Sequence, residues 1–145
     1  MLLFTQFNVG KRKLAWDMLC NDMSHAKRNK YNIFLITEPY LLKNGRCPKL
    51  PPGFIANGER FSRAVIVAHS SLNLWFSSEF SDQDITTVKL ISKTQSWYLC
   101  SLYCDILKDV IHPTFNKLVN SLDITGEAAI IGGDSNCHTP MIGSG

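Results

Sequence analysis

Short apolar runs, each about the length of one β-strand, recur along the chain and limit the folds that it can adopt. Most of them are rich in β-branched and aromatic residues, and several alternate with polar residues, as strands with one buried face do. Glycine, proline and serine residues that favour turns lie between them. The runs are residues 2–9, 31–37, 63–69, 72–76, 85–91, 96–103 and the run from 128 that leads to Asp134. This pattern predicts a strand-rich α/β domain.

Two further segments show the three- and four-residue spacing of apolar residues that is typical of helices. One is residues 11–30, where the expected apolar stripe consists of Leu14, Met18, Leu19, Met23 and Ala26. The other is residues 112–122, which has Pro113 near its expected start and a face formed by Phe115, Leu118, Val119 and Leu122. Because the first helix lies between two strand runs, we expect a βαβ-like unit. Residues 41–53 are expected to form a loop, and residues 92–95 a hairpin turn.

Composition supports a single globular domain and excludes little else. The chain has 145 residues, of which 45% are hydrophobic and 10% aromatic, which fits a packed core and not a disordered segment. The net charge of +3 is too small to indicate a polyanionic partner by itself. The five cysteines show no CxxC spacing, so we expect free thiols in a reducing compartment. No apolar run has the length of a membrane span, and we expect no membrane partner and an intracellular protein.

Polar side chains follow three of the apolar runs at the point where each run ends. Asn8 ends the first run, Glu38 follows the second, and Asp134 and Asn136 follow the last. Loops at strand ends are where α/β proteins often carry their chemistry. In extended chain, residues i and i+2 point the same way, so Asp134 and Asn136 can face one site. Since Mg²⁺ takes hard oxygen ligands, this combination favours a magnesium–phosphate site.

Each of these residues also has an ordinary structural explanation. Glu38 can be a solvated charge or a helix cap, and Asn8 can form a turn. Asp134 and Asn136 can form two successive Asx turns. The pair Gly132–Gly133 is expected to let the backbone turn sharply and a ligand approach closely.

Four motifs, in order along the chain, resemble those of the endonuclease/exonuclease/phosphatase family. They are QFN (6–8), ITEPY (36–40), SLYC (101–104) and GGDSNCHTPMIGS (132–144). Residues 63–75 and 80–90 also resemble middle strands of such domains. Within the family, the motifs most resemble the apurinic-endonuclease-like domains of non-LTR retrotransposons, mainly because of the last motif.

The resemblance implies a four-layer α/β/β/α sandwich that hydrolyses phosphodiester bonds with Mg²⁺ or Mn²⁺ as its cofactor. In such a site, Glu38 would bind the metal and Asn8 would lie beside it. Asp134 would position or deprotonate the attacking water, and Asn136 would hold the phosphate or the water. Tyr103 would reach the phosphate, although a tyrosine at a strand end more often packs in the core with its hydroxyl in water.

The same resemblance implies DNA as the substrate and a nicking endonuclease of a non-LTR retrotransposon as the parent protein. Lys11, Arg12 and Lys13 closely follow Asn8 and are expected to contact phosphates; a solvated loop is the alternative explanation of this cluster. His138 is expected to contact DNA from the last loop; a supporting role within that loop is the alternative explanation. A reverse transcriptase domain downstream in the parent protein and a nuclear location are further expectations.

Domains of this family continue past the Gly-Asp-x-Asn motif with further strands and an Asp-His pair, whereas this chain ends at Gly145. We therefore expect the C-terminal portion of the sandwich to be missing, and the chain alone to hydrolyse DNA poorly. Two alternatives stay open: another phosphoesterase of the same superfamily, and a non-catalytic remnant that binds nucleic acid or a partner.

Overall fold

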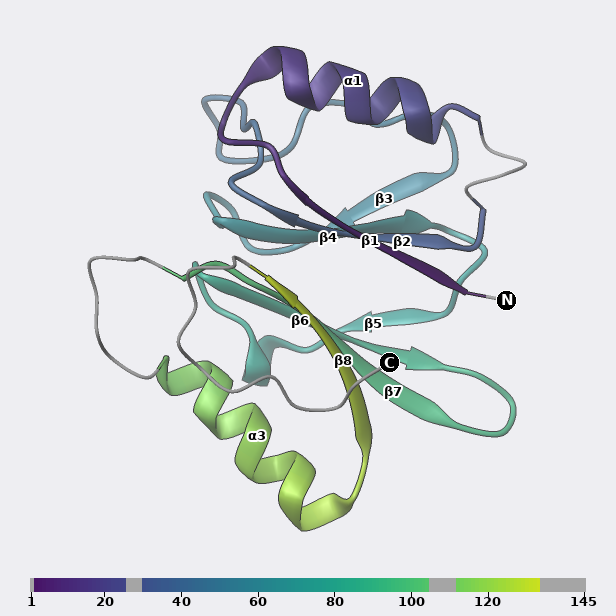
Figure 1. Cartoon of the computed structure of the whole chain (residues 1–145), viewed down its shortest axis with the longest axis vertical. Helices are drawn as coiled ribbons and strands as arrows, with labels where there is room; N and C mark the ends of the chain where they lie inside the picture. Colours follow the sequence, from purple (N-terminus) through teal and green to yellow (C-terminus); the bar gives the residue numbers. More distant parts are fainter. Residues whose placement is uncertain (1, 26–29, 105–111, 134–145) are drawn as a thin grey trace.

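Two four-stranded β-sheets pack face to face, and one helix covers the outer face of each sheet (Figure 1). This computed structural model describes residues 2–25, 30–104 and 112–133. The four layers follow the order helix, sheet, sheet, helix, which confirms the predicted α/β/β/α sandwich. Within the described segments, no helix is long and apolar enough to cross a lipid bilayer.

The first sheet is built around a βαβ unit. Strand β1 (Leu3–Asn8) leads into helix α1 (Lys13–Met23), which returns the chain to β2 (Asn32–Thr37), parallel to β1. Strand β4 (Ala64–His69) pairs antiparallel with β2, and β3 (Phe54–Asn57) pairs antiparallel with β4. The strand order is therefore β1-β2-β4-β3. Every residue of β2 is buried, because α1 covers one face of this strand and the second sheet covers the other.

The second sheet begins with an antiparallel meander. Its strands are β5 (Leu74–Phe76), β6 (Ile85–Ile91) and β7 (Ser96–Leu102), with a 3₁₀ helix at Ser78–Phe80 between the first two. The turn between β6 and β7 is the predicted hairpin, in which the Ser92 N–H donates to the Gln95 carbonyl at 2.9 Å. Strands β4 and β5 are neighbours in sequence but belong to different sheets.

A second βαβ unit completes this sheet. After β7, helix α3 (Pro113–Thr125) leads to β8 (Ala128–Gly133), which lies parallel to β7 at the edge of the sheet. The helix begins as predicted, with Pro113 in its first turn and His112 Nδ1 accepting a hydrogen bond from the Phe115 N–H. It ends at Thr125 and is capped by Gly126, whose φ of +72° is a left-handed value that glycine adopts without strain.

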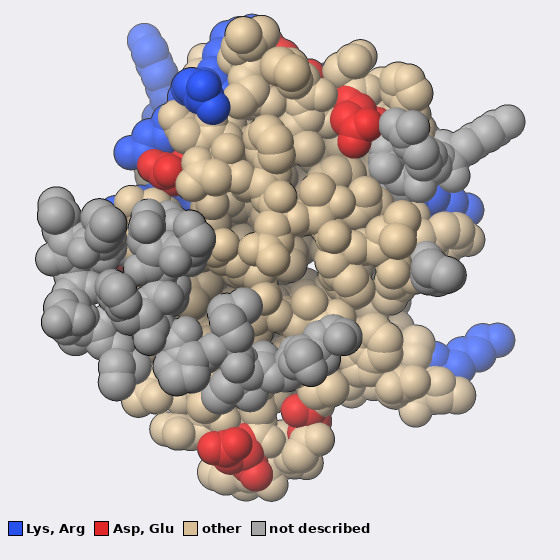
Figure 2. All heavy atoms as spheres, in the orientation of Figure 1, with Lys and Arg blue, Asp and Glu red and all other residues tan. Residues whose placement is uncertain are grey.

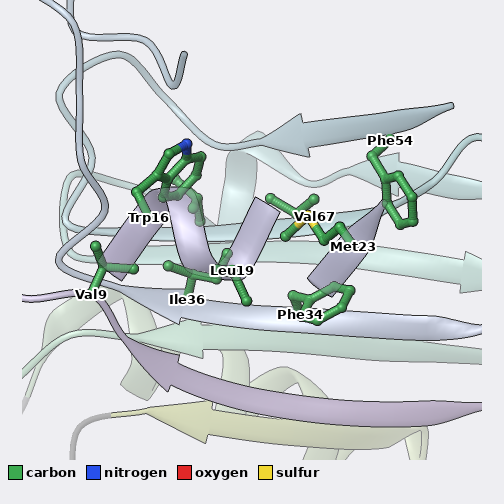
Figure 3. Packing of buried hydrophobic residues seen from close by; sticks show 9 residues of the cluster. Val9, Trp16, Leu19, Met23, Phe34, Ile36, Phe54 and Val67 are labelled. Atoms are coloured by element: carbon green, nitrogen blue, oxygen red, sulfur yellow. The ribbon is translucent and has the colours of Figure 1, made fainter. Parts of the chain in front are cut away.

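The core consists of three layers of apolar side chains, one between the sheets and one beneath each helix. The inter-sheet layer contains Ile33, Leu35, Ile66, Ala68, Val88, Leu90 and Leu99. Helix α1 packs onto Phe34, Ile36 and Val67 through Trp16, Leu19 and Met23 (Figure 3). Helix α3 buries Phe115, Leu118 and Leu122 as predicted, with Val119 half-buried beside them. Full burial of each large apolar side chain contributes about 1.5–3 kcal/mol, which fixes both helices on their sheets.

The apolar stripe predicted for α1 is wrong in part. Leu19 and Met23 are buried, but Leu14 and Met18 are 72% and 65% exposed. The buried side chain that the prediction missed is Trp16, which is 1% exposed. Residues two positions from Trp16 lie about 200° around a helix, so once the indole faces the sheet, Leu14 and Met18 must face away. Ala26 lies outside the described residues.

The cysteines behave only partly as expected. Cys20, Cys47 and Cys100 are free thiols, whereas Cys104 is disulfide-bonded, so the prediction of free thiols is wrong for Cys104. The spacing of cysteines in the sequence does not predict this bond, because the fold determines which cysteines come close enough to form a disulfide. Burial raises the pKa of Cys47 to about 11 and that of Cys100 to about 12, which keeps both thiols protonated near neutral pH.

Candidate active site

The carboxyl ends of β1 and β2 bring two of the predicted site residues into contact. The strands are parallel, with Asn8 opposite Thr37, so Asn8 and Glu38 leave the sheet side by side. Asn8 Nδ2 donates a hydrogen bond to Glu38 Oε2 at 3.0 Å. Asn8 is exposed and Glu38 is half-buried. The amide therefore orients the carboxylate at a surface that a ligand can reach.

Backbone hydrogen bonds hold Glu38 in an unusual conformation. Its φ is +48°, a left-handed value that costs about 1–2 kcal/mol for a residue with a Cβ atom. The Glu38 N–H donates to the Arg63 carbonyl at 2.8 Å, and the Glu38 carbonyl accepts from the Lys11 N–H at 2.9 Å. The start of β4 and the loop after β1 thus fix the position of Glu38 from both sides.

Tyr103 follows β7 and belongs to a cluster that joins the two sheets. The Arg63 guanidinium lies over the Tyr103 ring, 4.5 Å from its centroid, and Arg63 Nε forms an ion pair with Asp84 Oδ1 at 2.5 Å. The Tyr103 N–H donates to the Asp84 carbonyl at 2.8 Å. Arg63 and Asp84 are not among the site residues predicted from the sequence, because their only signal is a charge directly before an apolar run, which is common at strand ends.

A pocket of about 450 Å³ opens beside Glu38. Its lining includes Lys11, Glu38, Tyr40, Phe61, Arg63 and Gln83. Phe61 is also not among the predicted site residues, because its exposure depends on how the loop before β4 folds. The pocket combines a carboxylate, two cations and exposed aromatic surface, so it suits a ligand that is anionic at one end and aromatic at the other.

The three basic residues proposed as DNA contacts differ in their surroundings. Lys11 lines the pocket, and Arg12 Nε donates to the Val9 carbonyl at 3.4 Å. Lys13 lies in the first turn of α1, where its hydrogen bond to Asp17 raises its pKa above the usual value. Figure 2 shows Lys and Arg side chains gathered at the upper left, over the region where β1 leads into α1.

The remaining predicted site residues, Asp134, Asn136 and His138, lie outside the described residues. The last described residue before them, Gly133, ends β8, and its N–H donates to Gln6 Oε1 of β1 at 3.1 Å. Strand β8 therefore ends at the same edge of the molecule as Asn8 and Glu38.

The two glycines at the end of β8 serve close packing and not the predicted sharp turn. Both lie within the strand. A Cβ atom at Gly132 would lie 2.6 Å from Leu35 Cδ1 and 2.9 Å from Gln6 Cγ, and one at Gly133 would lie 2.5 Å from the Leu102 carbonyl oxygen. A side chain at Gly132 would push the two sheets apart, and one at Gly133 would push β8 away from β7. Because both glycines belong to strand β8, the prediction of a turn at these residues is wrong.

Glu38 and Asn8 supply oxygen donors of the kind that Mg²⁺ and Mn²⁺ take. One carboxylate and one amide do not form a closed cage, and no group of three or more His, Cys, Asp or Glu side chains in residues 2–25, 30–104 and 112–133 could hold a metal ion. The described residues would therefore supply only part of the ligand set of a divalent cation at this edge, and Mg²⁺ commonly takes further ligands from water and phosphate.

Comparison with known structures agrees with this architecture. No protein-family model matches the sequence, and no curated protein matches it significantly. The structure is similar to the endonuclease domain of TRAS1, a telomere-specific non-LTR retrotransposon, with a TM-score of 0.70 and 19% sequence identity; the match covers 96% of this chain and 61% of that domain. It is also similar to an endonuclease/exonuclease/phosphatase family protein from Leptotrichia buccalis C-1013-b, with a TM-score of 0.55 and 10% identity, covering 94% of this chain and 67% of that one. The chain thus has the endonuclease/exonuclease/phosphatase fold and spans 61% of the length of the TRAS1 domain.

Proposed function

We propose that this chain is part of a metal-dependent endonuclease that nicks DNA at the edge formed by Asn8 and Glu38. The observation that carries the proposal is the hydrogen bond between these two residues at the ends of parallel strands, next to a pocket. The fold shared with the TRAS1 endonuclease domain supports the choice of reaction.

Each side chain has a defined task in this proposal. Glu38 binds Mg²⁺ or Mn²⁺, which when bound stabilises negative charge on the phosphate oxygens. Asn8 orients the Glu38 carboxylate through the bond at 3.0 Å. Asp134 accepts a proton from the attacking water, and Asn136 holds the phosphate. The Tyr103 hydroxyl donates a hydrogen bond to a phosphate oxygen, while Arg63 and Asp84 hold the tyrosine in place.

DNA is the proposed substrate, and the basic residues near the site are its proposed contacts. Lys11, Arg12, Lys13 and His138 would bind backbone phosphates, which are the main source of affinity in sequence-independent binding. A reverse transcriptase domain elsewhere in the parent protein and a nuclear location belong to the same proposal.

The test is relaxation of supercoiled plasmid by the longest reading frame that contains this chain. We expect nicking in Mg²⁺ and none in EDTA. Glu38→Gln should slow nicking by about 10²–10³-fold, the loss seen when one transition-state-stabilising group is removed. Glu79→Gln is the matched control, because Glu79 is an exposed carboxylate in the 3₁₀ helix between β5 and β6, and it should leave the rate unchanged.

Nicking by Glu38→Gln at the wild-type rate, or nicking that survives EDTA, would contradict the proposal. The 145-residue chain by itself is expected to nick very poorly. If this chain nicks efficiently and Asp134→Ala abolishes that activity, then its own residues suffice and the expectation of poor activity is wrong.

A further inference from the structure

Backbone strain in the described residues is concentrated around one pocket. The non-glycine residues with a positive φ in residues 2–25, 30–104 and 112–133 are Lys11 (+60°), Glu38 (+48°) and Phe61 (+60°). All three line the pocket beside Glu38. Strained residues persist only where their surroundings hold them, and they cluster at active sites and ligand clamps. The pocket therefore has the character of a built ligand site.

Phe61 shows this most clearly. A bulky residue at φ +60° is an outlier, and this one keeps 51% of its surface exposed, so it gains only part of the benefit of burial. Its N–H donates to the Gly45 carbonyl at 2.7 Å, and its ring packs on Gly45, where a Cβ atom would lie 2.5 Å from Phe61 Cδ2. The ring is thus held rigidly against one loop with part of its surface in solvent.

The neighbours of Phe61 add charge in a suitable arrangement. The Arg60 guanidinium lies 5.8 Å from the ring centroid and is tied to the Asn44 carbonyl through Nε at 2.8 Å. Arg63 pairs with Asp84 and lies over the Tyr103 ring. Lys11 is the other cation that lines the pocket. An aromatic ring with cations nearby is the arrangement that binds unpaired nucleotides, because every base has a face that can stack.

We infer that this pocket binds one unpaired nucleotide of the nucleic acid strand, with its base stacked on Phe61 and its phosphate against Lys11. The pocket volume of about 450 Å³ is within the range of sites that enclose small ligands. The inference rests on the proposed function, since it assigns the pocket to the nucleotide next to the phosphate that Glu38 and Asn8 would handle.

The experiment measures binding without catalysis, by fluorescence anisotropy in EDTA. Two labelled single strands of equal length are compared: oligo-dT, and a strand with the same sugars and phosphates but no bases. Phe61→Leu should weaken binding of oligo-dT by about fivefold or more, the effect of losing one stacked base, and should leave the base-free strand within about twofold. Phe61→Tyr keeps an aromatic face and should bind oligo-dT like the wild type. Trp75→Leu removes another exposed aromatic that does not line the pocket, and should change neither affinity.

Three results would overturn the inference: equal loss of affinity for both strands in Phe61→Leu, no loss for either, or no preference of the wild type for the strand with bases. The first result would indicate a purely structural role of Phe61. The binding assay is run in EDTA and needs no catalytic metal, so its result can be interpreted even if the plasmid assay shows no nicking. Base-dependent binding without nicking would contradict only the proposed hydrolysis. Nicking without base-dependent binding would contradict only the nucleotide pocket.

Discussion

The two βαβ units have the same topology, but they differ in whether the residues at helix ends and at left-handed backbone positions favour those conformations. In the unit of β7, α3 and β8, proline begins the helix, His112 caps it, and the left-handed position after it is a glycine, Gly126. In the unit of β1, α1 and β2, Arg12 precedes the helix without a side-chain cap hydrogen bond. The left-handed positions just after β1 and β2 include Lys11 and Glu38, whose Cβ atoms make that conformation unfavourable.

This difference separates a unit whose helix is capped by residues suited to that role from one whose strand ends hold strained residues beside Asn8 and Glu38. Strain in the first unit occurs where β1 and β2 end, next to the contact between Asn8 and Glu38. In the second unit, no non-glycine residue with a positive φ occurs within residues 112–133. Because the two units share one connection type, topology alone does not account for the strain, and its place agrees with the function proposed for this edge.

The largest effect on stability is expected where the two units meet. Gly132→Ala would place a methyl group within 2.6 Å of Leu35 Cδ1, between the sheets. Overpacking of this kind should lower the free energy of unfolding by about 1–3 kcal/mol. Urea denaturation followed by circular dichroism measures the change. Ile124→Ala is the control, since Ile124 is 85% exposed on α3, and its effect should stay within about 0.5 kcal/mol. An unchanged midpoint for Gly132→Ala would mean that the sheets do not pack closely at β8.

A smaller pair of effects should have opposite signs in the two units. Gly126→Ala forces a Cβ into a left-handed conformation with no atom within 4 Å to clash, and should destabilise the protein by about 1 kcal/mol. Lys11→Gly relieves the same kind of strain and should stabilise it by up to about 1 kcal/mol, reduced by the greater freedom of glycine in the unfolded chain. The same urea titrations test both. Destabilisation by Lys11→Gly would remove the contrast between the two units.

Much of the fold could be predicted because local patterns dictate it. Strand β6 has the limits expected from its apolar run, and α3 carries both the proline and the apolar face that define a helix. Strand β3 was missed because its four residues directly follow a segment of prolines and glycines that reads as a loop. The face of α1 was misjudged because Leu14 and Met18 fit a helical stripe as well as Trp16 does, and only packing on the sheet chooses between them.

The candidate site could be predicted only in its strand-end residues. Asn8 and Glu38 each end an apolar run, so the parallel pairing of their strands was enough to bring them together. The loops that carry Arg63, Asp84 and Phe61 come together only in the tertiary structure. The spacing of residues in the sequence does not predict which loops meet.

If Glu38, oriented by Asn8, binds a divalent cation at this edge as proposed, titration of the chain with Mn²⁺ should detect that binding. Electron paramagnetic resonance measures free Mn²⁺, so the affinity can be obtained without any substrate or activity. We expect one weak site, as for an open arrangement of one carboxylate and waters. Glu38→Gln should weaken it by about tenfold or more, equivalent to about 1.4 kcal/mol, and Asn8→Ala by less. The carboxylate control Glu79→Gln should bind Mn²⁺ like the wild type. Unchanged binding by Glu38→Gln, or an equal loss in Glu79→Gln, would contradict the claim.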